Sequence, residues 1–293
     1  MRYLAVLGRR WQGRQAGGAQ DSTSDYGQAP PAQETALGRL LPPAVSGSAE
    51  RGSAPREPSR PGTRGELRVI PVEGLPEVVE GDDLGAMIAG AARLEDGDVV
   101  VVAQKAVSKA EGRVVRLAEV EPSPRARELA ADHDPRQTEV ILREAARVVR
   151  TRPPLIIAET RHGFVCASAG VDASNAPELE TVVLLPLDPD ASAGRLRARL
   201  RELTGREVSV IVSDSFGRAF RTGITGVAIG VAGLRPLLDL RGQRDRAGYE
   251  LRVTVIAVAD EIAGAAELVM GKTSRVPAAI VRGLSLAGEG SAR

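Results

Sequence analysis

The pattern of apolar positions along the chain changes at Glu66. Before it, residues 1–64 are mostly Gly, Ala, Pro, Ser, Gln and Arg without periodic apolar spacing, so they cannot bury enough surface to offset the entropy of ordering. We expect a disordered extension over 1–64, a folded catalytic domain over 65–286 and a flexible tail over 287–293. A misassigned upstream start codon would give the same composition, which leaves open whether residues 1–64 are translated.

Within the folded region, short apolar runs alternate with segments of helical spacing. Strands are predicted for LRVIPV, VVVVA, PPLIIAET, HGFVCASAGV, ETVVLLPL, VSVIV and ELRVTVIAVA. Helices are predicted for LGAMIAGAARL behind the acidic cap Asp82–Asp83, for ARELAADH, RQTEVILREAARVV and DEIAGAAELVM, and for Ala191 to Thr204 before Gly205. The segment from Gln104 to Gly112 is predicted to be a loop. Without a strict strand–helix–strand rhythm, this order favours an α+β fold over a doubly wound sheet.

Composition narrows the function classes. The net charge of +1 gives no global field to attract nucleic acid or an anionic membrane, and no apolar run approaches the ~20 residues of a membrane-spanning helix. One cysteine, Cys166, excludes an intrachain disulfide framework, and two histidines, His133 and His162, exclude a His-rich metal cluster. We therefore expect a cytoplasmic protein without nucleic-acid or membrane partners.

The distribution of lysine points to anion binding. Of 39 basic residues only Lys105, Lys109 and Lys272 are lysine, and all three lie in Gly- and Ser-containing segments with loop character. A compact ammonium group suits a phosphate as a point charge. Chance clustering of three residues is an equal alternative.

Two aspartates occupy similar positions after apolar runs. Asp172 follows VCASAGV and Asp214 follows VSVIV and a serine, and each is succeeded by short oxygen-bearing side chains, Ser174, Asn175 and Ser215. Carboxylate and hydroxyl oxygens are the ligands that Mg²⁺ and Mn²⁺ prefer. The alternative is that both aspartates cap turns, which is the commoner role of Asp before Ser or Gly.

Other motifs are weaker. The segment from Met270 to Ser274 matches the end of a phosphate-binding P-loop, but Ala266 stands where the first glycine belongs and the preceding residues have helical spacing. The glycines of GITGVAIGVAG lack a dinucleotide fingerprint and are explained by close backbone packing. Arg218 and Arg221 could clamp an anion or be solvated surface charges.

The histidines and the cysteine offer no hydrolase chemistry. His162 is expected in a turn, His133 beside a helix start, and Cys166 inside an apolar strand, where a thiol packs rather than reacts. Without a G-x-S-x-G motif, a serine or cysteine hydrolase is not supported.

Several segments in order resemble one enzyme family. They are VIPVEGLP, QKAVSKAEGR, HGFVCASAGVDASN, LLPLDPDASA, VSDSFGRAFRTG, VAIGVAGLRPLLDLRG, VADEIAGAAELVMGK and VPAAIVRGL, and they resemble the coenzyme F-420-0:L-glutamate ligase family over roughly Leu67 to Leu284. The resemblance implies that family's mixed sheet-and-helix architecture with two subdomains. It also implies GTP-dependent addition of L-glutamate to the deazaflavin coenzyme F-420-0, extended through γ-glutamyl links, in a homodimer.

The resemblance also implies roles for particular residues. A divalent metal, Mn²⁺ or Mg²⁺, would be held by Asp172, Asp214 and Ser215, with K⁺ as a further candidate ion. GTP would be surrounded by Glu73, Gly74, Leu75, Pro76, Gln104, Lys109, Asn175, Met270, Gly271, Lys272, Thr273, Ser274, Arg275, Val276 and Pro277. No catalytic nucleophile is implied. The alternatives are a metal-dependent phosphohydrolase and a non-catalytic nucleotide- or deazaflavin-binding protein on the same fold. The number of glutamates added, the oxidation form of the acceptor and the metal used in the cell stay open.

Overall fold

A mixed five-stranded sheet forms the centre of the fold. The computed structural model describes residues 62–286 and 288–292. Residues 1–61 of the expected extension and residues 287 and 293 of the expected tail lie outside the described residues, whereas residues 62–64, also expected to be disordered, belong to a strand. The sheet has the order β1-β12-β2-β8-β9, with β1 (Gly62–Pro71), β12 (Ala278–Ser285), β2 (Val99–Ala103), β8 (Ser209–Gly217) and β9 (Ile224–Ala232). Only β2 and β8 pair in parallel. The α+β class is confirmed.

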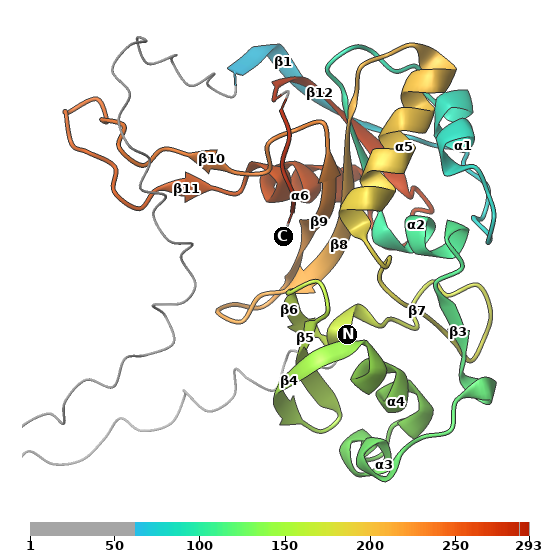
Figure 1. Cartoon of the computed structure of the whole chain (residues 1–293). Coiled ribbons are helices and arrows are strands. Elements are labelled where there is room, and N and C mark those ends of the chain that lie inside the picture. The colour runs from blue at the N-terminus through green and yellow to red at the C-terminus, as the bar shows by residue number, and fades with distance from the viewer. Residues whose placement is uncertain (1–61, 287, 293) are drawn as a thin grey trace, which may run out of the picture. The chain divides into compact units, whose positions relative to one another are not determined.

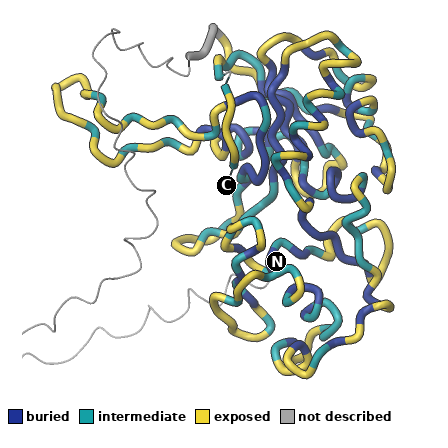
Figure 2. The backbone as a smooth tube through the Cα atoms, in the orientation of Figure 1, coloured by how far each residue is buried: buried dark blue, intermediate teal, exposed yellow. Residues whose placement is uncertain are grey.

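Helices cover both faces of this sheet (Figure 1). Successive side chains of a strand point to opposite faces. Accordingly, Val100 and Val102 pack in the core with α1 (Leu84–Ala91), α2 (Gln104–Ala110) and α5 (Pro189–Thr204), whereas Val99 and Val101 pack in the core with α6 (Val258–Met270). A strand buried on both faces is a continuous apolar run, which is why VVVVA was recognisable as a strand. Figure 2 shows the buried backbone concentrated in this sheet.

A second group of elements has its own hydrophobic core, which includes Leu117, Ile141, Ile156 and Val182. Its elements are β3 (Val114–Arg116), η2 (Leu117–Glu119), α3 (Pro124–Ala130), α4 (Pro135–Glu144), β4 (Ala145–Arg152), β5 (Leu155–Thr160), β6 (Val165–Ala167), η3 (Ser168–Gly170) and β7 (Thr181–Val183). Strand β3 pairs with β7, and β4, β5 and β6 form a three-stranded sheet. The sheet, with a hydrophobic cluster on each face, and this second group, with a third cluster, lie within one compact unit.

Local capping explains where several helices begin and end. The Asp83 carboxylate accepts a hydrogen bond from the Ala86 amide at 2.9 Å, and the Asp188 carboxylate accepts one from Ala191 at 3.1 Å. Helix α5 ends at Gly205, whose φ of 66° is the left-handed conformation that glycine adopts at low cost. These boundaries confirm the sequence signals at Asp83 and Gly205.

Four local predictions were wrong. Of the expected strand HGFVCASAGV only Val165–Ala167 is a strand, β6, and Ser168–Gly170 form the 3₁₀ helix η3. The expected loop from Gln104 is helix α2, because Ala106 and Val107 are buried in the main core and draw the chain into a helix. The end of RQTEVILREAARVV is strand β4, which pairs with β5. Of ELRVTVIAVA only Val255–Ile256 is a strand, β11, which pairs with β10 (Leu238–Asp239) in a separate two-stranded ribbon that leaves Val253 exposed.

The glycine-rich run forms β9, and its glycines allow close packing as expected. A Cβ at Gly230 would lie 2.3 Å from the carbonyl oxygen of Pro189, and one at Gly226 would lie 2.7 Å from that of Ala263. Helices α5 and α6 can therefore approach the strand only because these positions lack a side chain. Within the described part of the chain, no helix is long and apolar enough to cross a membrane.

Candidate active site

A cleft of about 790 Å³ opens at the carboxyl ends of the parallel strands β2 and β8. Ala103 pairs with Ser213 at this edge, so the residues that follow β2 meet the part of β8 that runs beyond this pairing. Its lining residues come from five segments: Leu75–Val78, Ala103–Ala106 with Lys109, Asn175–Pro177, Ser213–Ser215, and Glu267 with Met270–Thr273 and Arg275–Pro277. The volume is in the range of small-molecule sites.

Most of the residues expected around a nucleotide line this cleft. They are Leu75, Pro76, Gln104, Lys109, Asn175, Met270, Gly271, Lys272, Thr273, Arg275, Val276 and Pro277. Glu73, Gly74 and Ser274 are not among the lining residues. The Ser274 hydroxyl donates to the Met270 carbonyl at 2.6 Å, so it fastens the loop to the end of α6. The expected metal residues Asp214 and Ser215 line the cleft, whereas Asp172 contacts a lining residue.

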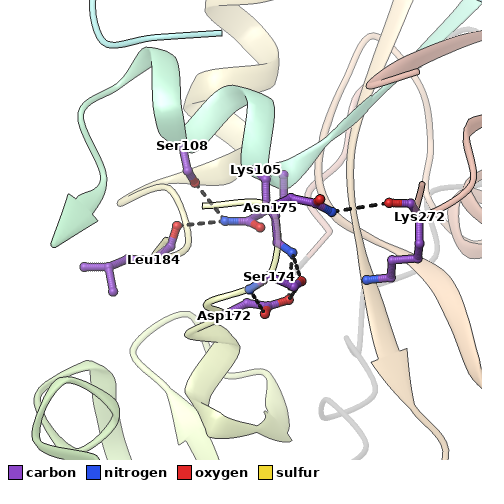
Figure 3. Close-up of polar contacts among 8 residues, drawn as sticks. Lys105, Ser108, Asp172, Ser174, Asn175, Leu184 and Lys272 are labelled. Carbon is purple, nitrogen blue, oxygen red and sulfur yellow. Dashed lines mark hydrogen bonds and ion pairs between the residues drawn. The ribbon is translucent and has the colours of Figure 1, made fainter. Parts of the chain in front are cut away.

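Gln104 connects the cleft to the second core. Its side chain is buried, and its amide nitrogen donates to the Ser108 hydroxyl at 2.8 Å and to the Leu184 carbonyl at 2.7 Å (Figure 3). Both donor hydrogens are thereby used within the protein. Gln104 fixes the start of α2 beside the segment after β7.

Asp172 forms the densest polar contacts near the cleft (Figure 3). Its Oδ1 accepts from the Ser174 amide at 2.7 Å, and its Oδ2 accepts from the Ser174 hydroxyl at 2.9 Å and from Lys105 Nζ at 2.7 Å. Burial by itself raises the pKa of this carboxyl, but the hydrogen bonds and charge of Lys105 outweigh burial and leave the pKa below its usual value. Asp172 is therefore ionised and paired.

Asp214 has the opposite electrostatic character. It lies on β8 where that strand runs beyond its pairing with β2, and burial raises the pKa of its carboxyl to about 6. Hydrogen bonding from the Ser215 amide and the charges of Lys272 and Lys105 oppose this rise, while the charge of Asp172 adds to it. The two carboxylates are thus close enough to interact.

This oxygen donor set fits a divalent cation that keeps part of its shell for other ligands. Among residues 62–286 and 288–292, no three or more His, Cys, Asp or Glu side chains gather in a metal-binding group. Two carboxylates and a hydroxyl are what Mg²⁺ typically takes from a protein when substrate phosphates and water supply the rest. The residues present therefore fit Mg²⁺ or Mn²⁺ at Asp172, Asp214 and Ser215.

Comparison with known proteins identifies the family. The F420-0:Gamma-glutamyl ligase family model matches residues 74–283. The chain belongs to this family. It is 54% identical to the coenzyme F420:L-glutamate ligase of Methanopyrus kandleri over 221 residues, which are 74% of this chain and 87% of the relative. It is 49% identical to the enzyme of the same name from Archaeoglobus fulgidus over 228 residues, 77% of this chain and 91% of the relative.

The matched segment, residues 74–283, contains every residue that lines the cleft of this glutamate ligase family member. The segment from Met270 to Ser274 is a loop that follows a helix, because α6 ends at Met270. The side-chain amide of Asn175 donates to the Lys272 carbonyl in this loop at 3.3 Å. A P-loop has the reverse order, strand, loop and helix, so the rejection of that motif is confirmed.

Sequence reasoning missed two charged residues of this site. Lys105 was noted as one of three lysines but not placed in the site, and Glu77, which forms an ion pair with Lys109, was not noted at all. Helical spacing could have found Lys105, because residues four apart share one helix face. The incorrect loop assignment over Gln104–Gly112 concealed that relation.

The remaining candidates have structural roles. Cys166 is buried in β6, and burial together with the Asp214 charge raises the pKa of its thiol to about 12, which confirms packing rather than reactivity. His162 lies in a turn, with Nε2 2.9 Å from the Pro186 carbonyl oxygen. Arg218 donates to the Thr222 carbonyl at 2.8 Å and so braces the β8–β9 turn.

Proposed function

We propose that this protein joins L-glutamate to coenzyme F-420-0 in a GTP-dependent reaction and extends the product through γ-glutamyl links. One observation carries the proposal: segments that match the ligase family over residues 74–283 converge on a single cleft with three lysines and two interacting carboxylates. Relatives with 48–54% identity are named coenzyme F420:L-glutamate ligase.

The chemistry requires that a carboxylate become a good acyl donor. An oxygen of the acceptor carboxylate attacks the γ-phosphorus of GTP, which forms an acyl phosphate and releases GDP. The amine of L-glutamate then attacks the acyl carbon, the bond from carbon to the phosphate oxygen breaks, and a proton passes from nitrogen to solvent. The products are an amide, GDP and phosphate, and no side-chain nucleophile is needed.

The residues of the cleft suit positioning and charge compensation. Lys105, Lys109 and Lys272 bring three ammonium groups to a cleft in which the polyphosphate of GTP carries several negative charges. A divalent cation at Asp172, Asp214 and Ser215 would offset the charge that develops on the phosphate oxygens. Holding donor and acceptor in contact converts an intermolecular reaction into an effectively intramolecular one, which supplies much of the rate.

A homodimer is part of the proposal. The ribbon of β10 and β11 projects from the sheet (Figure 1), and it and its flanks expose Leu237, Tyr249 and Val253. Exposed apolar side chains that extend from a fold favour association with another surface. Light scattering after size exclusion should give twice the chain mass, and Val253→Asp with Tyr249→Ser should give the monomer mass.

Phosphate release tests the proposed reaction against its alternatives. With GTP and Mn²⁺, phosphate should appear only when both L-glutamate and coenzyme F-420-0 are present. Phosphate release that is independent of glutamate would instead establish the phosphohydrolase, and GTP binding without any phosphate release would establish the non-catalytic binding protein. Asp214→Asn should abolish turnover while the circular dichroism spectrum stays unchanged, and Asp239→Asn, on the distant β10 strand, is the matched control.

A further inference from the structure

Lys105 contacts the carboxylate of Asp172 directly, at a position where a divalent cation is expected. Its Nζ is 2.7 Å from Asp172 Oδ2 and 2.7 Å from Ser174 Oγ, and its side chain is 14% exposed (Figure 3). Its charge also acts on Asp214, whose carboxyl group is the other expected cation ligand. Lys105 thus contacts one of the two carboxylates directly, and its charge, together with that of Lys272, acts on the other.

The contacts around Asp172 form a closed set. Lys105 donates to both Asp172 and Ser174, and the Ser174 hydroxyl donates in turn to Asp172 Oδ2. Oδ2 therefore accepts two hydrogen bonds, one of them charge-assisted, while Oδ1 accepts from the Ser174 amide. A cation that binds Oδ2 would compete with the Lys105 ammonium for this atom, and two positive charges at one oxygen repel each other.

The other two lysines of the cleft are placed differently. Lys109 lies one helical turn after Lys105 on α2, and its ammonium forms an ion pair with Glu77 rather than with an aspartate. Lys272 has no ion pair within 4.0 Å among the described residues. Its charge partly opposes the effect of burial, which raises the pKa of Asp214 to about 6. Only Lys105 of the three contacts an expected cation ligand directly.

We propose that Lys105 is a built-in counter-cation: it holds the Asp172 carboxylate in the cation-free protein and is displaced from it when a divalent cation binds. This inference rests on the proposed function, in which Asp172 is a ligand of the divalent cation. It gives Lys105 a positioning role, because the ammonium holds the carboxylate in place until the cation arrives. Because the cation must first displace Lys105, cation binding is weaker in the protein without nucleotide than it would be without this lysine. Lys105 lines the cleft, so its released ammonium faces the cleft.

Manganese binding without nucleotide or acceptor tests this role directly. The full chain is titrated with Mn²⁺, and free Mn²⁺ is followed by its electron paramagnetic resonance signal. Lys105→Met should bind Mn²⁺ about tenfold more tightly than wild type, since the competing charge-assisted contact is gone. Lys272→Met is the matched control, because it removes a positive charge from the same cleft without breaking a contact to Asp172, and it should change the affinity less than about threefold. Lys105→Arg keeps the charge and should stay within about threefold of wild type.

Thermal unfolding provides a second readout. Without Mn²⁺, Lys105→Met should melt below wild type because Asp172 and Asp214 lose their shared compensating charge, and saturating Mn²⁺ should raise its melting temperature more than that of wild type. Asp172→Asn should weaken Mn²⁺ binding at least tenfold and thereby locate the site.

Two results would overturn the inference. One is a Lys105→Met affinity equal to or weaker than that of Lys272→Met, and the other is Mn²⁺ binding that does not depend on Asp172. The proposed function fails separately: wild-type protein that forms no glutamylated product refutes the ligase, whereas product formation with an unchanged Lys105→Met affinity refutes only the role of Lys105.

Discussion

The substitution Asp98→Asn should destabilise the fold strongly, because it breaks a buried ion pair that joins two strands next to the cleft. Asp98 precedes β2 and is 1% exposed; its carboxylate accepts from Arg282 Nε at 2.7 Å, from an Arg282 terminal nitrogen at 2.8 Å and from the Glu95 amide at 2.7 Å. Arg282 lies on β12, so this pair fastens β12 to the turn before β2.

The magnitude follows from what remains after the change. Removing one partner of a buried pair costs about 3–5 kcal/mol, because the other charge stays buried. Arg282 retains the Glu95 carboxylate at 2.7 Å and the Arg93 carbonyl at 3.0 Å, which places Asp98→Asn near the lower end, about 3 kcal/mol. With an m-value of about 3 kcal/mol per molar urea, the midpoint should fall by about 1 M.

The assay is urea unfolding at pH 7, followed by circular dichroism. Asp96→Asn is the matched control in the same turn: Asp96 is 61% exposed and pairs with Arg206 at 3.2 Å, so its loss should cost less than about 1 kcal/mol. If Asp98→Asn lowered the free energy of unfolding no more than Asp96→Asn, the reasoning about the buried pair would be refuted.

Further predictions concern packing, pH and reactivity. Gly230→Ala should cost about 3 kcal/mol or prevent soluble expression, because its Cβ would meet the backbone at the start of α5 at 2.3 Å, whereas Gly90→Ala in α1, where nothing lies within 4 Å, should stabilise by about 0.5–1 kcal/mol. Hydrogen bonds from Ser123 lower the pKa of Glu139 to about 2, below its unfolded value of 4.5, so its stabilisation is complete above about pH 4.5 and is lost as the pH falls toward 2. Glu139→Gln should accordingly lower the melting temperature at pH 7 but much less at pH 3. Native Cys166 should react with a thiol reagent far more slowly than the unfolded chain, since its thiol pKa is about 12.

A specific result would refute each of these three predictions. Equal effects of the two glycine substitutions on the urea midpoint would refute the close approach at Gly230. A Glu139→Gln deficit as large at pH 3 as at pH 7 would show that its charge contributes nothing. Rapid labelling of native Cys166, measured by mass spectrometry, would contradict its burial.

The sequence predicted elements whose signals are local, and it failed where tertiary contacts decide. The start of α1 at Asp83 and the end of α5 at Gly205 follow from the side chain and backbone of single residues. Helix α2 does not: its seven residues are too few for a clear period, and burial of Ala106 and Val107 in the main core determines it. The apolar runs before Asp172 and Asp214 indicated both residues, and their charges do interact. Neither residue follows a strand directly, however: Asp172 comes after η3, and Asp214 lies within β8.

The partners of those aspartates needed the structure. No spacing in the sequence relates Lys105 to Asp172, because the contact spans two segments that only the packing of the second core against α2 brings together. The family resemblance indicated the remaining cleft residues because members of one family share a fold and place matching residues at matching positions. Residue propensity and apolar periodicity give no such information.

Mass spectrometry of the product tests the central claim most directly. Coenzyme F-420-0 is incubated with the purified full chain, GTP, Mn²⁺ and L-glutamate, beside matched reactions that lack GTP or contain Asp214→Asn. We expect the coenzyme to gain the mass of one or more glutamyl residues only in the complete wild-type reaction. An unchanged coenzyme mass in that reaction, with GTP hydrolysed, would contradict the ligase assignment.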